Sequence, residues 1–127
     1  MVSGTWQSAP GEVERAVNHA IGAGYRHIDG ACCYQNEDEV GQGIKDAIAA
    51  GKAKREDLFV TTKLWCTFHT RVEEALDTSL KKLGLDYLDL FLVHWPLAMN
   101  PNGMLETACF LVCMQNLTID REPPPLP

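Results

Sequence analysis

Apolar and polar positions along the first hundred residues follow two different periods. Apolar side chains recur three and four residues apart, the spacing of an amphipathic helix, in residues 10–23, 36–51 and 70–84. Each of these segments has a glycine at or just after its end, which is typical of a helix C-terminus. Shorter apolar runs separate the helical segments, at residues 25–31, 58–62 and 85–96. The pattern predicts strands that alternate with helices.

The alternation predicts an α/β fold with a parallel sheet. If "MVSGTW" at the start is a first strand, the order is β-α-β-α-β-α-β, and such connections are right-handed crossovers. An open doubly wound sheet and a (β/α) barrel both fit this order. Neither G-x-G-x-x-G nor G-x-x-x-x-G-K-[ST] follows a predicted strand, which favours the barrel. A full (β/α)8 barrel needs about 250 residues, so about four β/α units, half a barrel, are expected here.

The character of the chain changes after Gly103. Residues 104–120 form one apolar segment whose periodicity fits either a helix or a buried strand, and a Pro-rich tail follows. We therefore expect two parts, with residues 1–103 as half of a barrel and residues 104–127 as a divergent apolar segment with its tail. The R-x-x-P-x-x-P spacing of Arg121, Pro124 and Pro127 also suits an SH3-type groove, although short Pro-rich tails are common.

Charge and composition narrow the classes of partner. A formal net charge of -6 argues against binding to a phosphate backbone, so small molecules or proteins are the expected partners rather than nucleic acid. No apolar run is long enough to span a membrane, and the start of the chain lacks a secretory signal. We expect a cytoplasmic protein. The five cysteines include no C-x-x-C pair and are expected to be thiols, not disulfides or metal ligands: Cys32, Cys33, Cys66, Cys109 and Cys113.

Chemically complementary side chains recur where predicted strands end. Asp29, Lys63 and His94 end three successive strands, and Tyr34 lies in the loop after Asp29. Taken singly, each has an ordinary explanation, because loops collect polar groups. In a parallel barrel, however, the carboxyl ends of all strands lie on one face, where catalytic groups sit. Tryptophans that follow strand ends are expected to wall the same face: Trp6, Trp65 and Trp95.

This set of groups suits the reduction of a carbonyl compound. The reaction needs a hydride, which no side chain supplies, so a nicotinamide cofactor is implied. It also needs a proton donor for the carbonyl oxygen. A tyrosine phenol ordinarily has a pKa of about 10, and a nearby lysine ammonium favours its ionised form. An aspartate would hold the lysine charged and oriented, and a histidine would orient the carbonyl group.

The same residues resemble the aldo-keto reductase superfamily. "GYRHIDGACCYQNEDEVG" resembles its first signature, "LDYLDLFLVHWP" its second, and "KLW" the strand that carries its lysine. The resemblance runs from about Gly4 to Gly103 and implies the N-terminal half of a (β/α)8 TIM barrel with NADPH as the hydride source. It also implies a catalytic tetrad. In that tetrad Tyr34 donates the proton, Lys63 and Asp29 tune the acidity of Tyr34, and His94 orients the substrate.

The resemblance further assigns contacts and leaves two functional hypotheses. It implies cofactor contacts from Gly4, Thr5, Trp6 and Asp29, and substrate contacts from Trp6, Trp65, His94 and Trp95; no metal is implied. The family's fifth to eighth strands, which carry most adenosine and phosphate contacts, have no counterpart, so we expect weak NADPH binding at most. The first hypothesis is an NADPH-dependent oxidoreductase that reduces aldehydes and ketones. The alternative is a catalytically inactive truncated isoform or fragment that associates through exposed sheet edges.

Overall fold

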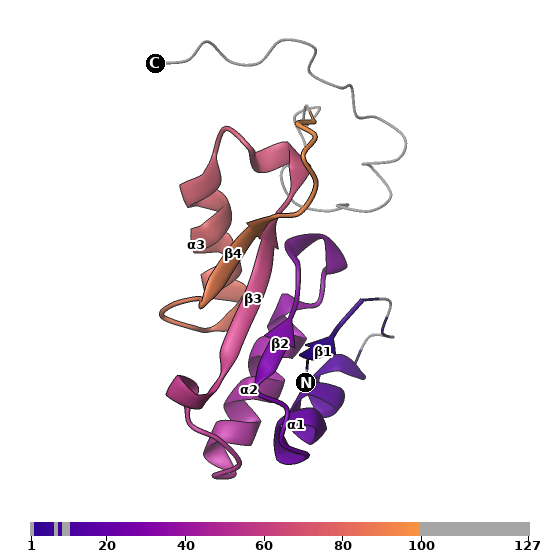
Figure 1. Ribbon diagram of the computed structural model, residues 1–127, viewed down its shortest axis with the longest axis vertical. Helices are drawn as coiled ribbons and strands as arrows, with labels where there is room; N and C mark the ends of the chain where they lie inside the picture. The colour runs from indigo at the N-terminus through magenta and orange to yellow at the C-terminus, as the bar shows by residue number, and fades with distance from the viewer. Residues whose placement is uncertain (1, 7, 9–10, 100–127) are drawn as a thin grey trace.

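A four-stranded parallel sheet with helices on one face forms the fold. The computed structural model describes residues 2–6, 8 and 11–99. The sheet has the order β1-β2-β3-β4, with β1 at Val2–Gly4, β2 at His27–Asp29, β3 at Phe59–Leu64 and β4 at Leu90–Val93. Three helices connect the strands: α1 at Val13–Gly22, α2 at Glu37–Ala49 and α3 at Val72–Leu83. The predicted alternation and the partial α/β barrel are confirmed (Figure 1).

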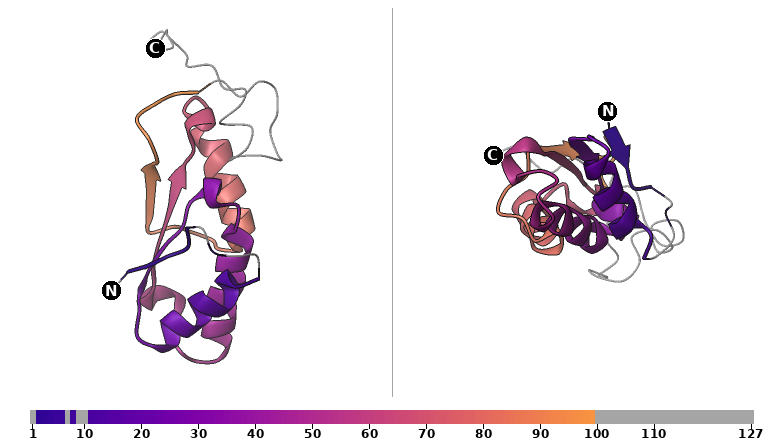
Figure 2. Two further views of the ribbon diagram at one scale, coloured as in Figure 1. Left: turned by 90° about the vertical axis from the view of Figure 1, so that its right-hand side faces the viewer. Right: turned by 90° about the horizontal axis from the view of Figure 1, so that it is seen from below.

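The parallel register determines which side chains share a face of the sheet. Asp29 of β2 pairs with Thr61 of β3, which in turn pairs with Leu90 of β4. Because side chains alternate along a strand, Lys63 lies on the same face as Thr61 and therefore as Asp29. All three α-helices cover the opposite face (Figure 2). The helix-free face thus carries the charged groups at its carboxyl end.

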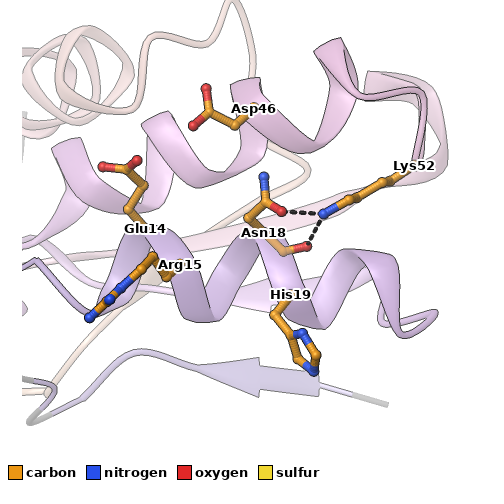
Figure 3. Close-up of a pocket in the computed structure, with 6 residues that line it drawn as sticks. All are labelled: Glu14, Arg15, Asn18, His19, Asp46 and Lys52. Atoms are coloured by element: carbon orange, nitrogen blue, oxygen red, sulfur yellow. Dashed lines mark hydrogen bonds between the residues drawn. The ribbon is translucent and has the colours of Figure 1, made fainter.

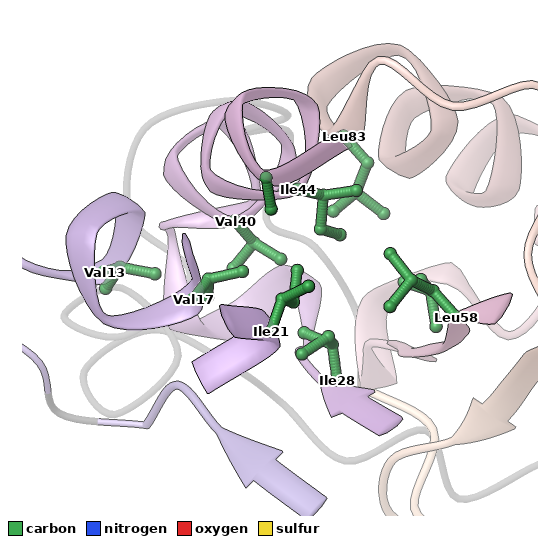
Figure 4. Packing of buried hydrophobic residues seen from close by; sticks show 10 residues of the cluster. Val13, Val17, Ile21, Ile28, Val40, Ile44, Leu58 and Leu83 are labelled. Carbon is green, nitrogen blue, oxygen red and sulfur yellow. The ribbon is translucent and has the colours of Figure 1, made fainter. Parts of the chain in front are cut away.

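The hydrophobic core lies between the sheet and the helices. Ile21 of α1, Ile44 of α2 and Ile28 of β2 are completely buried there (Figure 4). Helix α2 approaches α3 closely, because a Cβ at Gly41 would lie 2.2 Å from the carbonyl oxygen of Leu83. The other members of the cluster come from α1, α2, α3, β3 and the residue before β3: Val13, Val17, Val40, Ala47, Leu83, Val60 and Leu58.

The last strand differs from the others in its exposure. The sequence pattern predicts a strand within residues 85–96, and in the described part of the chain its apolar residues Leu90, Leu92 and Val93 are 38%, 41% and 59% exposed. Strand β3 covers one edge of β4, and no described strand pairs with the other edge. The apolar side chains of β4 are typical of a strand with neighbours on both edges, whereas among the described residues only β3 pairs with it.

Several predictions concern residues that the structure does not describe. Residues 104–127, with Cys109, Cys113 and the Arg121, Pro124 and Pro127 spacing, lie outside the described residues, as does Pro10 at the start of the first predicted helix. The division of the chain near Gly103 therefore stays a prediction. Within the described residues, none of the helices has the length and apolar character needed to cross a bilayer.

Candidate active site

The carboxyl ends of β2 and β3 bring a lysine against an aspartate. Lys63 Nζ donates hydrogen bonds to both carboxylate oxygens of Asp29, at 2.9 and 2.8 Å, and to the carbonyl oxygen of Gly30 at 2.8 Å. The side chains of Lys63 and Asp29 are 13% and 30% exposed. Charge-assisted hydrogen bonds in such a partly buried setting are stronger than neutral ones. The Lys63 side chain is therefore held in one place by three hydrogen bonds.

Tyr34 reaches the same ammonium group from the loop that follows β2. It ends a 3-10 turn over Cys32–Tyr34, in which the Tyr34 N–H donates to Ala31 O at 3.0 Å, and Gln35 then adopts a left-handed conformation with φ of 56°. The phenolic oxygen of Tyr34 lies 3.4 Å from Lys63 Nζ. The turn thus places a hydroxyl next to the cation that Asp29 orients.

His94 follows β4 directly and lies against the aromatic residues of the site. Its backbone N–H donates to Leu64 O at 3.0 Å, and its ring meets those of Tyr34 and Trp65 edge to face, with centroids 5.7 and 5.5 Å away. Burial lowers the pKa of His94 and the charge of Lys63 lowers it further, while Asp29 opposes both effects. The neutral imidazole is therefore favoured.

The three tryptophans differ in how far the side chains are exposed. Trp6 packs on Tyr34 with ring centroids 4.9 Å apart and is 46% exposed. Trp65 is buried, and the ring centroid of Trp95 lies 6.0 Å from that of Trp65, with Trp95 52% exposed. The predicted tryptophans thus lie around Tyr34 and His94.

Thr5, just before Trp6, is buried, and its hydroxyl has no hydrogen-bond partner among the described residues.

Two further contacts of this region did not follow from the sequence. Cys33, which the sequence predicts only to be a thiol, places its Sγ 3.4 Å from His94 Nδ1. Asn36 is buried and donates from Nδ2 to Thr5 O at 2.9 Å, which ties the loop after β1 to the start of α2. In the sequence, both residues lie between Asp29 and the next helix, which places them near the candidate site. Their contacts could not be predicted, because His94 and Thr5 are distant from them along the chain.

A buried carboxylate lies behind the site, on the helix-covered side of β3. Glu37 is 2% exposed and accepts hydrogen bonds from Thr62 Oγ1 at 2.7 Å and from Ser79 Oγ at 3.3 Å. These contacts join α2, β3 and α3 next to Lys63. Acidic residues are common in the first turn of a helix, where Glu37 lies, and the sequence did not indicate that this one is buried.

A polar hollow on the outer side of the helices is separate from this site. Figure 3 shows it between α1 and α2, with Lys52 Nζ donating to the side chain of Asn18. None of the predicted site residues contributes to it; the residues around it are Glu14, Arg15, Asn18, His19, Asp46 and Lys52. Across the described ranges, no cluster of histidine, cysteine and acidic side chains is arranged to hold a metal ion.

Fold and site together place the chain among α/β-barrel proteins with functional groups at the carboxyl ends of their strands. Comparison with known proteins gives the family: the model of the aldo/keto reductase family matches residues 1–117. The chain belongs to the aldo/keto reductase family. The resemblance of its motifs to that family is thereby confirmed.

Individual relatives agree with this assignment. The chain is 63% identical over 100 residues to D-galacturonate reductase of Hypocrea jecorina. The aligned region covers 79% of this chain and 32% of that protein. The structure of aldose reductase from Schistosoma japonicum matches at a TM-score of 0.77 and 47% identity, over 81% of this chain and 35% of that one. The structure of a Bombyx mori aldo-keto reductase in complex with NADP matches at a TM-score of 0.76 and 51% identity, over 84% of this chain and 37% of that one. The chain thus spans about a third of the length of these relatives.

Proposed function

We propose that this chain carries the proton-transfer site of an NADPH-dependent reductase that converts small aldehydes or ketones to alcohols. The observation that carries the proposal is the position of Lys63 Nζ, 2.8 Å from the Asp29 carboxylate and 3.4 Å from the Tyr34 hydroxyl. The names of relatives point the same way, since one is a D-galacturonate reductase and another was solved in complex with NADP.

Each polar group has a proposed step. Tyr34 donates its proton to the carbonyl oxygen, and the Lys63 ammonium stabilises the negative charge left on the phenolic oxygen. At about 4 Å, one unit charge contributes at most about 4 kcal/mol at an effective dielectric constant near 20, before desolvation costs. Asp29 keeps the ammonium charged and aimed, and His94 donates a hydrogen bond that orients the carbonyl group. Trp6, Trp65 and Trp95 are the proposed walls that limit water near the reacting oxygen.

The residues near Tyr34 fit one end of the cofactor. NADPH, when bound, supplies the hydride that no side chain provides. We propose that Gly4, Thr5, Trp6 and Asp29 contact it. In support, the Thr5 hydroxyl lacks a partner among the described residues, and Trp6 offers an exposed aromatic surface beside Tyr34. Lys63, the lysine of this cluster, is already engaged by Asp29, so the site as described offers little to hold the cofactor's phosphates.

The test measures aldehyde-dependent NADPH oxidation by the purified 127-residue protein, with glyceraldehyde as the probe and millimolar NADPH to allow for weak binding. Tyr34→Phe is the matched variant, because it removes only the hydroxyl group. We expect the wild-type rate to exceed that of Tyr34→Phe by about 10²-fold or more, the usual contribution of a positioned acid. Equal rates in two folded proteins, as judged by circular dichroism, would overturn the proposal.

A second candidate function is self-association without catalysis, and the exposure of β4 favours it. Leu90, Leu92 and Val93 present apolar side chains at a sheet edge that no described strand covers, and such edges pair with other chains. Light scattering distinguishes the cases: a well-folded monomer would reject self-association. Micromolar NADPH binding by fluorescence, together with aldehyde-dependent oxidation, would reject the inactive alternative.

The proposed partners and location rest on the sequence. Small carbonyl compounds are the partners that the proposed reaction requires. An acidic chain with a net charge of -6 favours them over nucleic acid. We infer a cytoplasmic location from the five cysteines without a disulfide pattern, and immunofluorescence of the tagged protein in its own cells would test it.

A further inference from the structure

Cys33 contacts a ring nitrogen of the histidine in the candidate site. Its Sγ lies 3.4 Å from His94 Nδ1, a distance at which sulfur takes part in a hydrogen bond. The residue is 6% exposed and belongs to the buried cluster with Ala31, Trp65 and Cys66. Because it directly precedes Tyr34 in the 3-10 turn, the backbone that positions the phenol also positions this sulfur.

The contact bears on which ring nitrogen of His94 carries the proton. A neutral imidazole has one N–H and one nitrogen lone pair, while a thiol is a weak donor and a weak acceptor. The imidazole lone pair is a better acceptor than sulfur, so the better pairing has S–H donating to Nδ1. We infer that the Cys33 thiol donates to Nδ1 of His94, so that Cys33 is a positioning residue that holds the imidazole as its Nε2–H tautomer.

The surroundings of His94 restrict the ring as this inference requires. The backbone of His94 is bonded to Leu64, and its ring lies edge to face against Tyr34 and Trp65. Burial and the charge of Lys63 lower the pKa of His94, so the neutral ring, which alone has tautomers, is the favoured form. The ring is thus held by packing, and the thiol selects between its two neutral forms.

The tautomer matters for the reaction proposed above, on which this consequence rests. A carbonyl oxygen presents lone pairs, so the histidine that orients it must offer an N–H. With Nδ1 accepting from Cys33, Nε2 carries the hydrogen and is able to donate to the substrate. In the reversed tautomer Nε2 would present a lone pair toward the carbonyl oxygen and repel it. Cys33 thereby acts on the substrate only through His94.

The experiment is nitrogen-15 NMR of the 127-residue protein with labelled histidine, recorded without NADPH at pH 8. Long-range nitrogen–hydrogen correlations distinguish protonated from unprotonated ring nitrogens. Loss of one set of signals in His94→Gln assigns His94 among the four histidines. His27, whose Nε2 lies 2.9 Å from Thr61 Oγ1, serves as an internal control, because its signals should not change in variants of Cys33.

Three proteins give the expected pattern. Wild-type His94 should be the Nε2–H tautomer, and Cys33→Ser, which keeps a donor, should retain it. Cys33→Val fills the space without a donor and should raise the ratio of Nδ1–H to Nε2–H by about fivefold, the equilibrium effect of one neutral hydrogen bond. An Nδ1–H tautomer in the wild type, or an unchanged ratio in folded Cys33→Val, would overturn the inference.

The design separates this inference from the proposed function. Tautomers are measured without cofactor or substrate, so a protein that reduces no aldehyde still tests Cys33. If Cys33→Val does not fold, the wild-type tautomer still tests the inference, since Nδ1–H there contradicts thiol donation. The rate comparison with Tyr34→Phe, in turn, leaves Cys33 and His94 unchanged.

Discussion

Strand β3 has an ion pair near each of its ends, and the two pairs differ in what surrounds them. Before its first residue, Arg55 Nη2 contacts Asp89 Oδ2 at 2.8 Å. Near its last residue, Lys63 Nζ contacts Asp29 Oδ2 at the same distance. The side chains of both pairs are between 13% and 30% exposed. Distance and burial alone therefore do not separate a structural ion pair from a chemical one.

The neighbours of Arg55 are all groups that hold the fold together. Arg55 donates to Leu58 O at 2.8 Å and to Tyr87 O at 3.0 Å, and its guanidinium lies 3.9 Å from the centre of the Tyr87 ring. Asp89 also accepts from Val60 N at 2.8 Å. Apart from the local bond to Leu58 O, these contacts connect the start of β3 and the turn before it to the segment before β4, which is a structural role.

The Lys63 pair, by contrast, has a neighbour that is able to react. The Tyr34 hydroxyl lies 3.4 Å from Lys63 Nζ, and the exposed ring of Trp6 lies beside it. In parallel barrels the carboxyl ends of strands carry function and the amino ends carry stability. We therefore propose that the third group beside an ion pair, here the Tyr34 hydroxyl, distinguishes the proposed chemical role of the Lys63 pair from the structural role of the Arg55 pair.

The largest expected difference between the two ends is in rate. Lys63→Met removes the ammonium group beside Tyr34, and we expect aldehyde-dependent NADPH oxidation per folded molecule to fall by about 10²- to 10³-fold. Arg55→Met should leave that rate within about twofold, since no contact of Arg55 reaches Tyr34. Stopped assays at millimolar NADPH measure both, with Lys45→Met on the exposed side of α2 as the control. Retention of the wild-type rate in Lys63→Met would remove the distinction between the ends.

The second largest effect is on stability and concerns the other end. Arg55→Met leaves Asp89 without its cation and two carbonyl groups without a donor, which should lower the free energy of unfolding by about 2 kcal/mol. Lys54→Met is a matched control, because the Lys54–Glu56 pair is 3.7 Å long with side chains 77% and 70% exposed. Exposed pairs contribute little, so the control should change by less than about 0.5 kcal/mol. Urea denaturation measures both, and equal losses would contradict the structural role of Arg55.

Lowering the pH should weaken the Arg55–Asp89 ion pair through protonation of the Asp89 carboxylate. Burial raises the pKa of Asp89, but hydrogen bonds from Val60 N and Arg55 and the Arg55 charge outweigh it, so the pKa lies below its usual value of 3.8. The resulting stabilisation is present above the unfolded-state pKa and is lost as the pH falls through the lower folded-state pKa. Asp89→Asn should lower stability by about 1 kcal/mol at pH 7 and flatten the decline below about pH 4. An unchanged acid limb of the urea-derived stability curve would refute this.

Most helices and strands of the fold, and the grouping of the polar site residues at the carboxyl ends of the strands, were predicted from the sequence. The helical period and short β-rich runs predicted α1 to α3 and β2 to β4, because each helix buries one stripe against a sheet. Asp29, Lys63 and His94 were expected together because each ends a strand, and parallel pairing brings those ends together. Their catalytic roles stay predictions, but the structure brings Asp29, Lys63 and Tyr34 into contact.

What the sequence did not predict depends on tertiary contacts. The contact of Cys33 with His94 is made from a 3-10 turn, which no periodicity in the sequence indicates. Glu37 reads as a solvated acid at a helix start, yet it is buried because Thr62 and Ser79 supply its hydrogen bonds. Val72 fits the predicted apolar stripe of α3 but is 44% exposed, since it lies in the first turn and burial begins at Ala75.

The smallest expected effect is a pH dependence that arises from His94. Its pKa is lowered in the folded protein by burial and by Lys63, and Asp29 opposes the shift, so the net effect is limited. Between the lowered folded-state pKa and the usual value of 6.5, the unfolded chain binds more protons. Stability should therefore be constant above about pH 7 and decline as the pH falls below about 6.5. His94→Gln should flatten this part of the urea-derived stability curve while Arg55→Met lowers the whole curve and leaves its slope there unchanged. If Arg55→Met flattened the curve in this pH range and His94→Gln did not, the pH dependence would arise at the Arg55 end of β3 and the prediction would be wrong.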